Sequence, residues 1–177
     1  MQQSRALQLL AKQDRQGRYV FTSQDLGKLF PEDSGGTLRA SLQRLVKSGV
    51  LIRVVKGVYV FALSRHIGAN TIEAIAKAMR RGEYSYVSLE SALSEYGVIS
   101  QIPIDRITIM TTGRKGEYQT PYGVIEFTHT ERPLKEIINS MKSVGRPLRL
   151  ATKLAAWRDL KRVGRNTHLV EEELLHE

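Results

Sequence analysis

Residues 35–49, GGTLRASLQRLVKSG, carry a clear helical pattern. Its apolar residues recur at i, i+4, i+7 and i+8, which is the spacing of one buried face of a helix: Leu38, Leu42, Leu45 and Val46. Ser48-Gly49 ends this helix. The opposite face carries small, polar and basic side chains, namely Ala40, Gln43, Arg44 and Lys47, with Thr37 and Arg39 on its flanks. The stretch therefore predicts a helix with one core face and one exposed basic face.

Shorter elements surround this helix. The periodicity predicts helices over residues 4–13, 23–30 and 37–47. It also predicts a short strand over 19–21 and the two strands of a hairpin over 50–55 and 58–63. Thr22 or Ser23 can cap the second helix, and Pro31 ends it. Helix, strand, helix, turn, helix and hairpin is the order of a winged helix-turn-helix. We therefore expect a winged helix-turn-helix domain over residues 1–66.

Basic residues concentrate in the same part of the chain. Residues 1–66 hold eleven Lys or Arg and four Asp or Glu, a net charge of +7 out of +9 for all 177 residues. Residues 67–145 are neutral, and residues 146–177 carry +2. This asymmetry is typical of a polyanion-binding module joined to a neutral one. The alternative is a basic surface that is solvated and binds no partner.

The outward face of the helix over 37–47 fits a DNA major groove, which is about 12 Å wide. We expect Thr37, Gln43 and Arg44 to reach base edges. The remaining basic residues of this part of the chain are expected to contact phosphates. The hairpin is expected to contact the DNA backbone or the minor groove. The predicted DNA-binding residues are Ser34, Gly36, Thr37, Arg39, Ala40, Gln43, Arg44, Lys47, Arg53, Lys56 and Lys28. Two alternatives stay open: winged helices also serve as protein–protein modules, and Arg39 can pair with Glu32 or Asp33.

Residues 70–177 predict a second, α+β domain after a connector, so the expected fold class is α+β overall. Helices are expected after Thr71, after Ser88, over 133–141 and from Ala151, with strands over 106–112, 117–120 and 124–128. Two groups of basic residues in this domain are candidate secondary contacts with nucleic acid or a partner: Arg114 and Lys115 in a turn, and Lys153, Arg158, Lys161 and Arg162 near the C-terminus.

Signatures of catalysis and metal binding are sparse. The chain has no cysteine, which excludes a thiolate zinc site, and its four histidines lack ligand spacing. We interpret Ser88 and Glu90 as helix-capping residues, Asp159 as a surface acid and His129 as a structural or surface residue. The sequence predicts a protein that is not an enzyme, needs no cofactor or metal, and is soluble and cytoplasmic without a membrane segment.

Several short motifs occur in an order that resembles the AbiEi family of antitoxins. They are Gly57-Val58-Tyr59, Ser88-Leu89-Glu90-Ser91-Ala92-Leu93, the strand 107–112, the run 116–130 and Ala151-Thr152-Lys153-Leu154-Ala155. The resemblance implies a bacterial antitoxin of a type IV toxin–antitoxin, or abortive infection, system whose partner toxin is a nucleotidyltransferase. It also implies that the N-terminal winged helix represses the operon by binding inverted repeats in the promoter, and that the C-terminal domain contributes antitoxicity.

Two other functions are compatible with the same sequence. One is a transcriptional regulator whose C-terminal domain senses an effector or partner. The other is an interaction protein that blocks the toxin directly through residues 70–177. The expected partners are therefore double-stranded operator DNA and a nucleotidyltransferase toxin, whether or not the toxin is contacted directly.

Overall fold

The computed structural model describes residues 2–100 and 105–177 and shows an α+β fold with two sheets, which confirms the expected fold class. The chain divides into two compact units, Met1–Met79 and Arg80–Glu177. The expected domains, 1–66 and 70–177, differ from these units in where α4 (Thr71–Met79) belongs. Helix α4 belongs to the first unit because it packs against strands of that unit's sheet.

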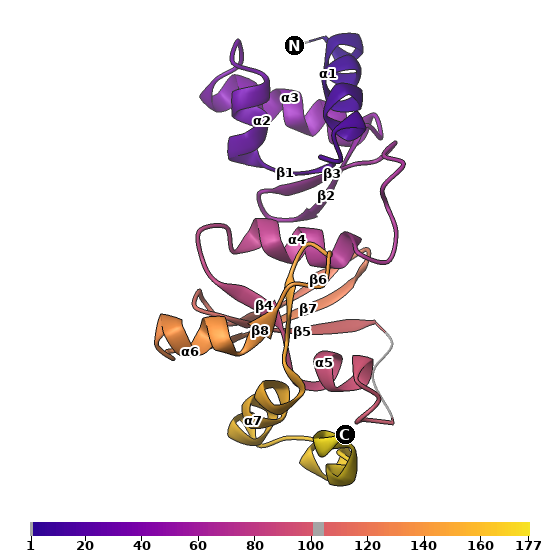
Figure 1. Cartoon of the computed structure of the whole chain (residues 1–177). Coiled ribbons are helices and arrows are strands. Elements are labelled where there is room, and N and C mark those ends of the chain that lie inside the picture. The colour runs from indigo at the N-terminus through magenta and orange to yellow at the C-terminus, as the bar shows by residue number, and fades with distance from the viewer. Residues whose placement is uncertain (1, 101–104) are drawn as a thin grey trace. The chain divides into compact units, whose positions relative to one another are not determined.

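Unit 1, Met1–Met79, is built from four helices and three short strands among its described residues (Figure 1). In order they are α1 (Gln3–Arg15), β1 (Val20–Thr22), α2 (Ser23–Leu29), α3 (Gly35–Lys47), β2 (Leu51–Val55), β3 (Val58–Phe61) and α4. The strands form an antiparallel sheet in the order β1-β3-β2. This sheet lies between α3, which packs against β2, and α4, which packs against β1 and β3 (Figure 1).

Local sequence explains where the elements of unit 1 begin and turn. Thr22 caps α2: its hydroxyl accepts a hydrogen bond from the Asp25 backbone N–H, and the Asp25 carboxylate accepts one from the Thr22 N–H. The tight turn between β2 and β3 needs a positive φ, which Gly57 supplies at +78°. On the core face predicted for α3, Leu42 and Leu45 are buried and Leu38 and Val46 are half-buried.

The segment between β3 and α4 is tied back to α1 through Asp14. This carboxylate, 5% exposed, accepts hydrogen bonds from the Ser64 hydroxyl and the Arg65 backbone N–H. Burial raises the pKa of Asp14, but these hydrogen bonds and the electrostatic interactions with His66 and Arg65 outweigh burial, and the pKa lies below its usual value. Further along, the hydroxyl groups of Tyr19 and Thr71 lie 3.1 Å apart, which joins α4 to the start of β1.

Unit 2, Arg80–Glu177, contains one six-stranded mixed sheet and three α-helices among its described residues. Its elements are β4 (Ser85–Val87), α5 (Leu89–Glu95), β5 (Arg106–Thr111), β6 (Gly116–Thr120), β7 (Gly123–His129), α6 (Leu134–Asn139), β8 (Met141–Lys142), β9 (Arg149–Ala151), α7 (Lys153–Val163) and the 3-10 helices η1 (Thr167–Leu169) and η2 (Glu172–His176). The sheet order is β6-β7-β5-β4-β9-β8. The pairs β5–β7 and β4–β9 are parallel, and the others are antiparallel.

Unit 2 departs from the expected elements at one edge of its sheet. Strands β8 and β9 were not predicted, because they are two and three residues long and carry little periodicity. The expected helix over 133–141 ends at Asn139, and Met141 already belongs to β8. Across the described ranges of both units, no helix has the length and apolar character required to cross a membrane.

Candidate nucleic-acid interface

Helix α3 presents the polar and basic face that the sequence predicts. Its core side buries Ser41, Leu42 and Leu45, whereas Thr37, Ala40, Gln43, Arg44 and Lys47 on the other side are exposed. These exposed positions repeat at three- and four-residue intervals and therefore lie on one face of the helix. Small residues come first and cations last along this face.

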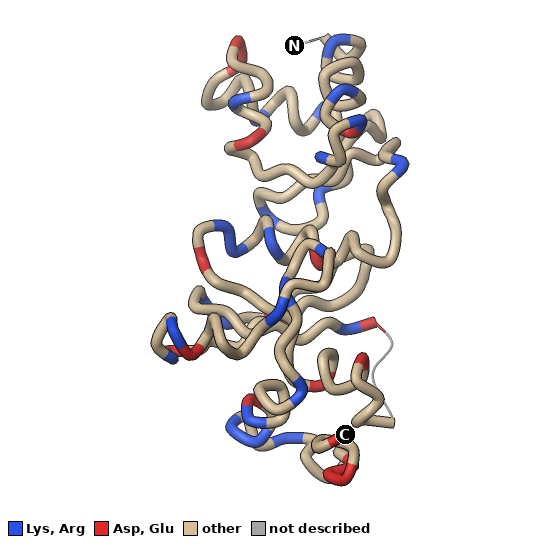
Figure 2. The backbone as a smooth tube through the Cα atoms, viewed as in Figure 1, with Lys and Arg blue, Asp and Glu red and all other residues tan. Residues whose placement is uncertain are grey.

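All the predicted DNA-binding residues are exposed. Eight lie on α3 or at its N-cap, and the others are on α2, on β2 and in the turn that follows β2: Ser34, Gly36, Thr37, Arg39, Ala40, Gln43, Arg44, Lys47, Lys28, Arg53 and Lys56. Figure 2 shows Lys and Arg spread over unit 1, with few acidic residues among them. Unit 1 holds twelve Lys or Arg against five Asp or Glu, a net charge of +7.

Most of these cations have no internal partner. Within the described ranges, no side-chain hydrogen bond or ion pair involves Lys28, Arg39, Lys47, Arg53 or Lys56. The two acids considered as partners of Arg39 are engaged elsewhere. Glu32 binds Arg5 with an N–O distance of 2.7 Å, and Asp33 accepts a hydrogen bond from the Ser41 hydroxyl at 2.7 Å. The charge of Arg39 is therefore available to an external anion.

Arg44 differs from these cations because it is oriented from within the unit. Its Nη2 donates to the Ser41 hydroxyl at 3.0 Å, and that hydroxyl donates to the buried Asp33 carboxylate. Asp33 is 7% exposed and immediately precedes the start of α3. This hydrogen-bonded chain limits the rotamers of Arg44 while leaving its side chain exposed, and a preordered guanidinium loses less entropy when it meets a base edge.

The first turn of α3 is open to an approaching phosphate. Ser34 occupies the N-cap position, but its side chain makes no capping hydrogen bond. A Cβ built on Gly35 or Gly36 would meet no atom within 4 Å, so this end of the helix faces open space. Unsatisfied N–H groups and the positive end of the helix dipole favour an anion there.

The basic residues of unit 2 that were considered as secondary contacts fall into two groups. Arg114, Lys115, Lys161 and Arg162 are exposed, and the Lys161 ammonium lies 5.1 Å from the Trp157 ring centroid. Lys153 and Arg158 are used inside the unit. The ammonium of Lys153 donates to the Leu174 carbonyl at 2.9 Å, and Arg158 donates to Asp159 and to the Ser140 hydroxyl.

Asp159 is not the surface acid that was expected. Its side chain is completely buried and accepts hydrogen bonds from the Tyr86 hydroxyl at 3.1 Å and the Ser88 hydroxyl at 2.8 Å. Burial, together with the neighbouring carboxylate, raises the pKa of Tyr86. Ser88 does occupy the N-cap position of α5, but its hydroxyl serves Asp159 rather than the helix end, so the expected capping role is wrong. His129 is structural as expected, since its Nδ1 lies 2.7 Å from the Gly113 carbonyl.

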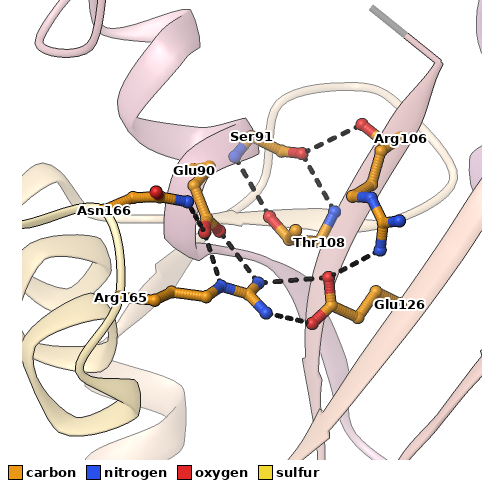
Figure 3. Close-up of a pocket in the computed structure, with 7 residues that line it drawn as sticks. All are labelled: Glu90, Ser91, Arg106, Thr108, Glu126, Arg165 and Asn166. Carbon is orange, nitrogen blue, oxygen red and sulfur yellow. Dashed lines mark hydrogen bonds and ion pairs between the residues drawn. The ribbon is translucent and has the colours of Figure 1, made fainter. Parts of the chain in front are cut away.

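A charged pocket of about 300 Å³ in unit 2 was missed altogether. It is lined by Glu90, Ser91, Arg106, Thr108, Glu126, Arg165 and Asn166 (Figure 3). The carboxylate of Glu90, which we expected to cap α5, binds Arg165. Arg165 lies 75 residues from Glu90 and 39 from Glu126, so no local spacing signals the cluster. Elsewhere in the described chain, no group of three or more His, Asp or Glu is placed to hold a metal ion.

Comparison with known proteins shows a fold relative. No protein-family model matches the sequence, and no curated protein matches it. The structure is similar to the crystal structure of the RV2827C protein from Mycobacterium tuberculosis, with a TM-score of 0.56 and 17% sequence identity. The match covers 97% of this chain and 70% of that chain. At this identity the likeness concerns the fold alone.

Proposed function

We propose that unit 1 is a winged helix-turn-helix that binds double-stranded DNA, with α3 in the major groove and the β2–β3 hairpin as the wing. The observation that carries this proposal is the set of exposed cations without internal partners: Lys28, Arg39, Lys47, Arg53 and Lys56. The element order α1-β1-α2-α3-β2-β3 and the sheet order β1-β3-β2 support it.

The contacts divide by chemistry. Gln43 and Arg44 in the C-terminal half of α3 can read base edges, and arginine binds the O6 and N7 atoms of guanine in a bidentate manner. Arg39, Lys47 and Lys28 neutralise phosphates, which positions the protein without reading sequence. Each neutralised phosphate adds about −0.9 to the slope of log affinity against log salt concentration.

The direct test is fluorescence anisotropy of the whole protein on the DNA upstream of its own gene, across a salt series, with an unrelated duplex as competitor. Arg39→Ala combined with Lys47→Ala is expected to lower the affinity and the salt slope. Lys77→Ala is the matched control, because Lys77 is an exposed cation on α4, on the other side of the sheet from α3. Equal losses in the variant and the control would contradict the assigned surface.

For the whole chain we propose a repressor-antitoxin that silences its own operon and counteracts a nucleotidyltransferase toxin. The support is the AbiEi-like order of motifs, joined to a basic unit suited to operator DNA. A promoter fusion tests repression. A nucleotidyltransferase gene next to this one would support the antitoxin, and growth during expression of that gene would test protection. Repression without protection would favour a regulator with a sensing domain. Protection accompanied by a stable complex would favour direct blocking of the toxin.

A further inference from the structure

Arg165 fills a site made by two carboxylates of unit 2. Its Nε donates to Oε1 of Glu90 at 2.6 Å and its Nη2 to Oε2 of Glu90 at 3.1 Å. Nη1 and Nη2 also donate to Oε1 and Oε2 of Glu126. A single guanidinium thus contacts all four carboxylate oxygens, from α5 on one side and β7 on the other (Figure 3). This planar, doubly bidentate arrangement suits a guanidinium and does not suit an ammonium group.

The two acids form the floor of the site and Arg165 lies at its mouth. The side chains of Glu90 and Glu126 are 8% and 14% exposed, whereas that of Arg165 is 36% exposed. The hydroxyls of Ser91 and Thr108 on the pocket wall are occupied, since each accepts a hydrogen bond from the other residue's backbone N–H. A ligand could therefore replace the Arg165 guanidinium from outside without breaking the hydrogen bonds between Ser91 and Thr108.

Arg165 comes from a turn rather than from a regular element. Its neighbours Gly164 and Asn166 both have left-handed backbone conformations, with φ values of +77° and +56°. The segment beyond it is attached by a hydrogen bond from Asn166 to Glu90, a backbone hydrogen bond from Glu171 to Val98, a single bridge between Ile99 and Val170, the bond from Lys153 to Leu174 and the buried side chain of Leu175. Segments with few hydrogen bonds open at low free-energy cost.

The geometry points to a guanidinium-binding site formed by Glu90 and Glu126, which Arg165 occupies in this state and which an external guanidinium group occupies when residues 164–177 move away. Without Arg165, the site would present these two acids and the neighbouring Glu117 against Arg106 alone, so it would attract a cation. Glu117 and Glu126 both bind Arg106, which holds Glu126 in place for the incoming group. The internal arginine competes at high effective concentration, so the site opens only to a ligand that is abundant or tethered.

The first experiment is chemical rescue in the full chain. Arg165→Ala is expected to lower the melting temperature, and millimolar methylguanidinium is expected to restore at least half of the loss. Methylammonium and potassium chloride at the same concentration are expected to restore none. Arg162→Ala, which removes an exposed cation three residues earlier, is the matched control and should respond to neither compound. Rescue should disappear when Glu126→Gln is added to Arg165→Ala.

If Arg165→Ala does not fold, Arg165→Lys keeps the charge without the planar fork, and the same rescue is expected. Equal rescue by methylammonium, or none by methylguanidinium, would overturn a guanidinium site. The second experiment measures hydrogen exchange at the Glu171 amide of the wild-type protein, which should accelerate with methylguanidinium or a Gly-Arg-Gly peptide. Acceleration by the peptide alone assigns the site to an arginine side chain, and acceleration by both assigns it to the guanidinium group itself. Exchange that neither compound changes would mean that the ion pair is permanent and would overturn the exchangeable site.

Discussion

The two units use their positive charge in opposite ways. In unit 1, Lys28, Arg39, Lys47, Arg53 and Lys56 project into solvent without a side-chain hydrogen bond or ion pair among the described residues. In unit 2, five arginines are bound to carboxylates of the same unit: Arg106, Arg132, Arg146, Arg158 and Arg165. A cation that is already neutralised inside the fold contributes little to the attraction of a polyanion. The units therefore differ in the charge that remains available, as well as in net charge.

The paired charges of unit 2 are expected to stabilise its fold, whereas the unpaired cations of unit 1 are expected to serve binding. Buried carboxylates in unit 2 hold elements that are distant in sequence, so removing one leaves an uncompensated charge inside the fold. Exposed cations in unit 1 contribute little to stability, because solvent screens them, and they can be removed without unfolding the unit. Substitutions in unit 2 are thus expected to change stability, and substitutions on α3 to change DNA binding.

The largest effect is expected for Asp159→Ala. The substitution strands the hydroxyls of Tyr86 and Ser88 and leaves the Arg158 guanidinium without its carboxylate, so it should cost about 3–5 kcal/mol of unfolding free energy. Urea denaturation followed by circular dichroism measures this loss. Glu173→Ala, which removes an exposed acid from η2, is the control and should change little. A loss no larger than that of the control would mean that the buried network does not stabilise unit 2.

Arg44→Ala comes next and should act on binding instead. Losing a base contact is expected to weaken binding to the operator by about 1–3 kcal/mol, with relaxed preference at one base pair. Anisotropy titrations on the operator and on single-base variants measure both quantities, with Lys77→Ala as the control. A melting temperature that falls as far as in Asp159→Ala would contradict the division of roles between the two units.

The stability of unit 2 should also fall in acid through Glu90. Burial raises the pKa of Glu90, but hydrogen bonds from Arg165 and Asn166 and the charge of Arg165 outweigh it, and the folded-state pKa lies below the ordinary 4.5. The stabilisation is therefore complete above about pH 4.5 and is lost as the pH falls through the lowered folded-state pKa. Urea denaturation at a series of acidic pH values should show a flatter decline for Glu90→Gln than for the wild type. Glu173→Gln should retain the wild-type decline.

The smallest effect is expected for Lys47→Ala. A single phosphate contact is lost, so the salt slope should decrease in magnitude by about 0.9 while binding weakens equally on all sequences. Anisotropy at several salt concentrations on operator and unrelated DNA provides the measurement. Weakening confined to the operator would show that Lys47 reads a base rather than a phosphate.

Sequence periodicity predicted the elements of unit 1 closely. The helix expected over 37–47 spans Gly35–Lys47, and the cap left open between Thr22 and Ser23 is Thr22. The bounds of α3 and the cap of α2 both depend on residues only a few positions apart, because the spacing of side chains along a helix determines which are buried and which cap it. Strands β8 and β9 escaped prediction because such short strands are defined by their partners, and β9 pairs with β4, which lies far away in the chain.

What the sequence alone determined is therefore local: the position of α3, its outward basic face and the accumulation of +7 charge in the first part of the chain. Which charges remain available depends on the folded chain, because ion pairs form between segments that are distant in the sequence. The tertiary structure placed α4 with unit 1, buried Asp159 beside Tyr86 and Ser88, and brought Arg165 between Glu90 and Glu126. No local sequence pattern predicts an ion pair between residues 75 positions apart, because only the fold brings them together.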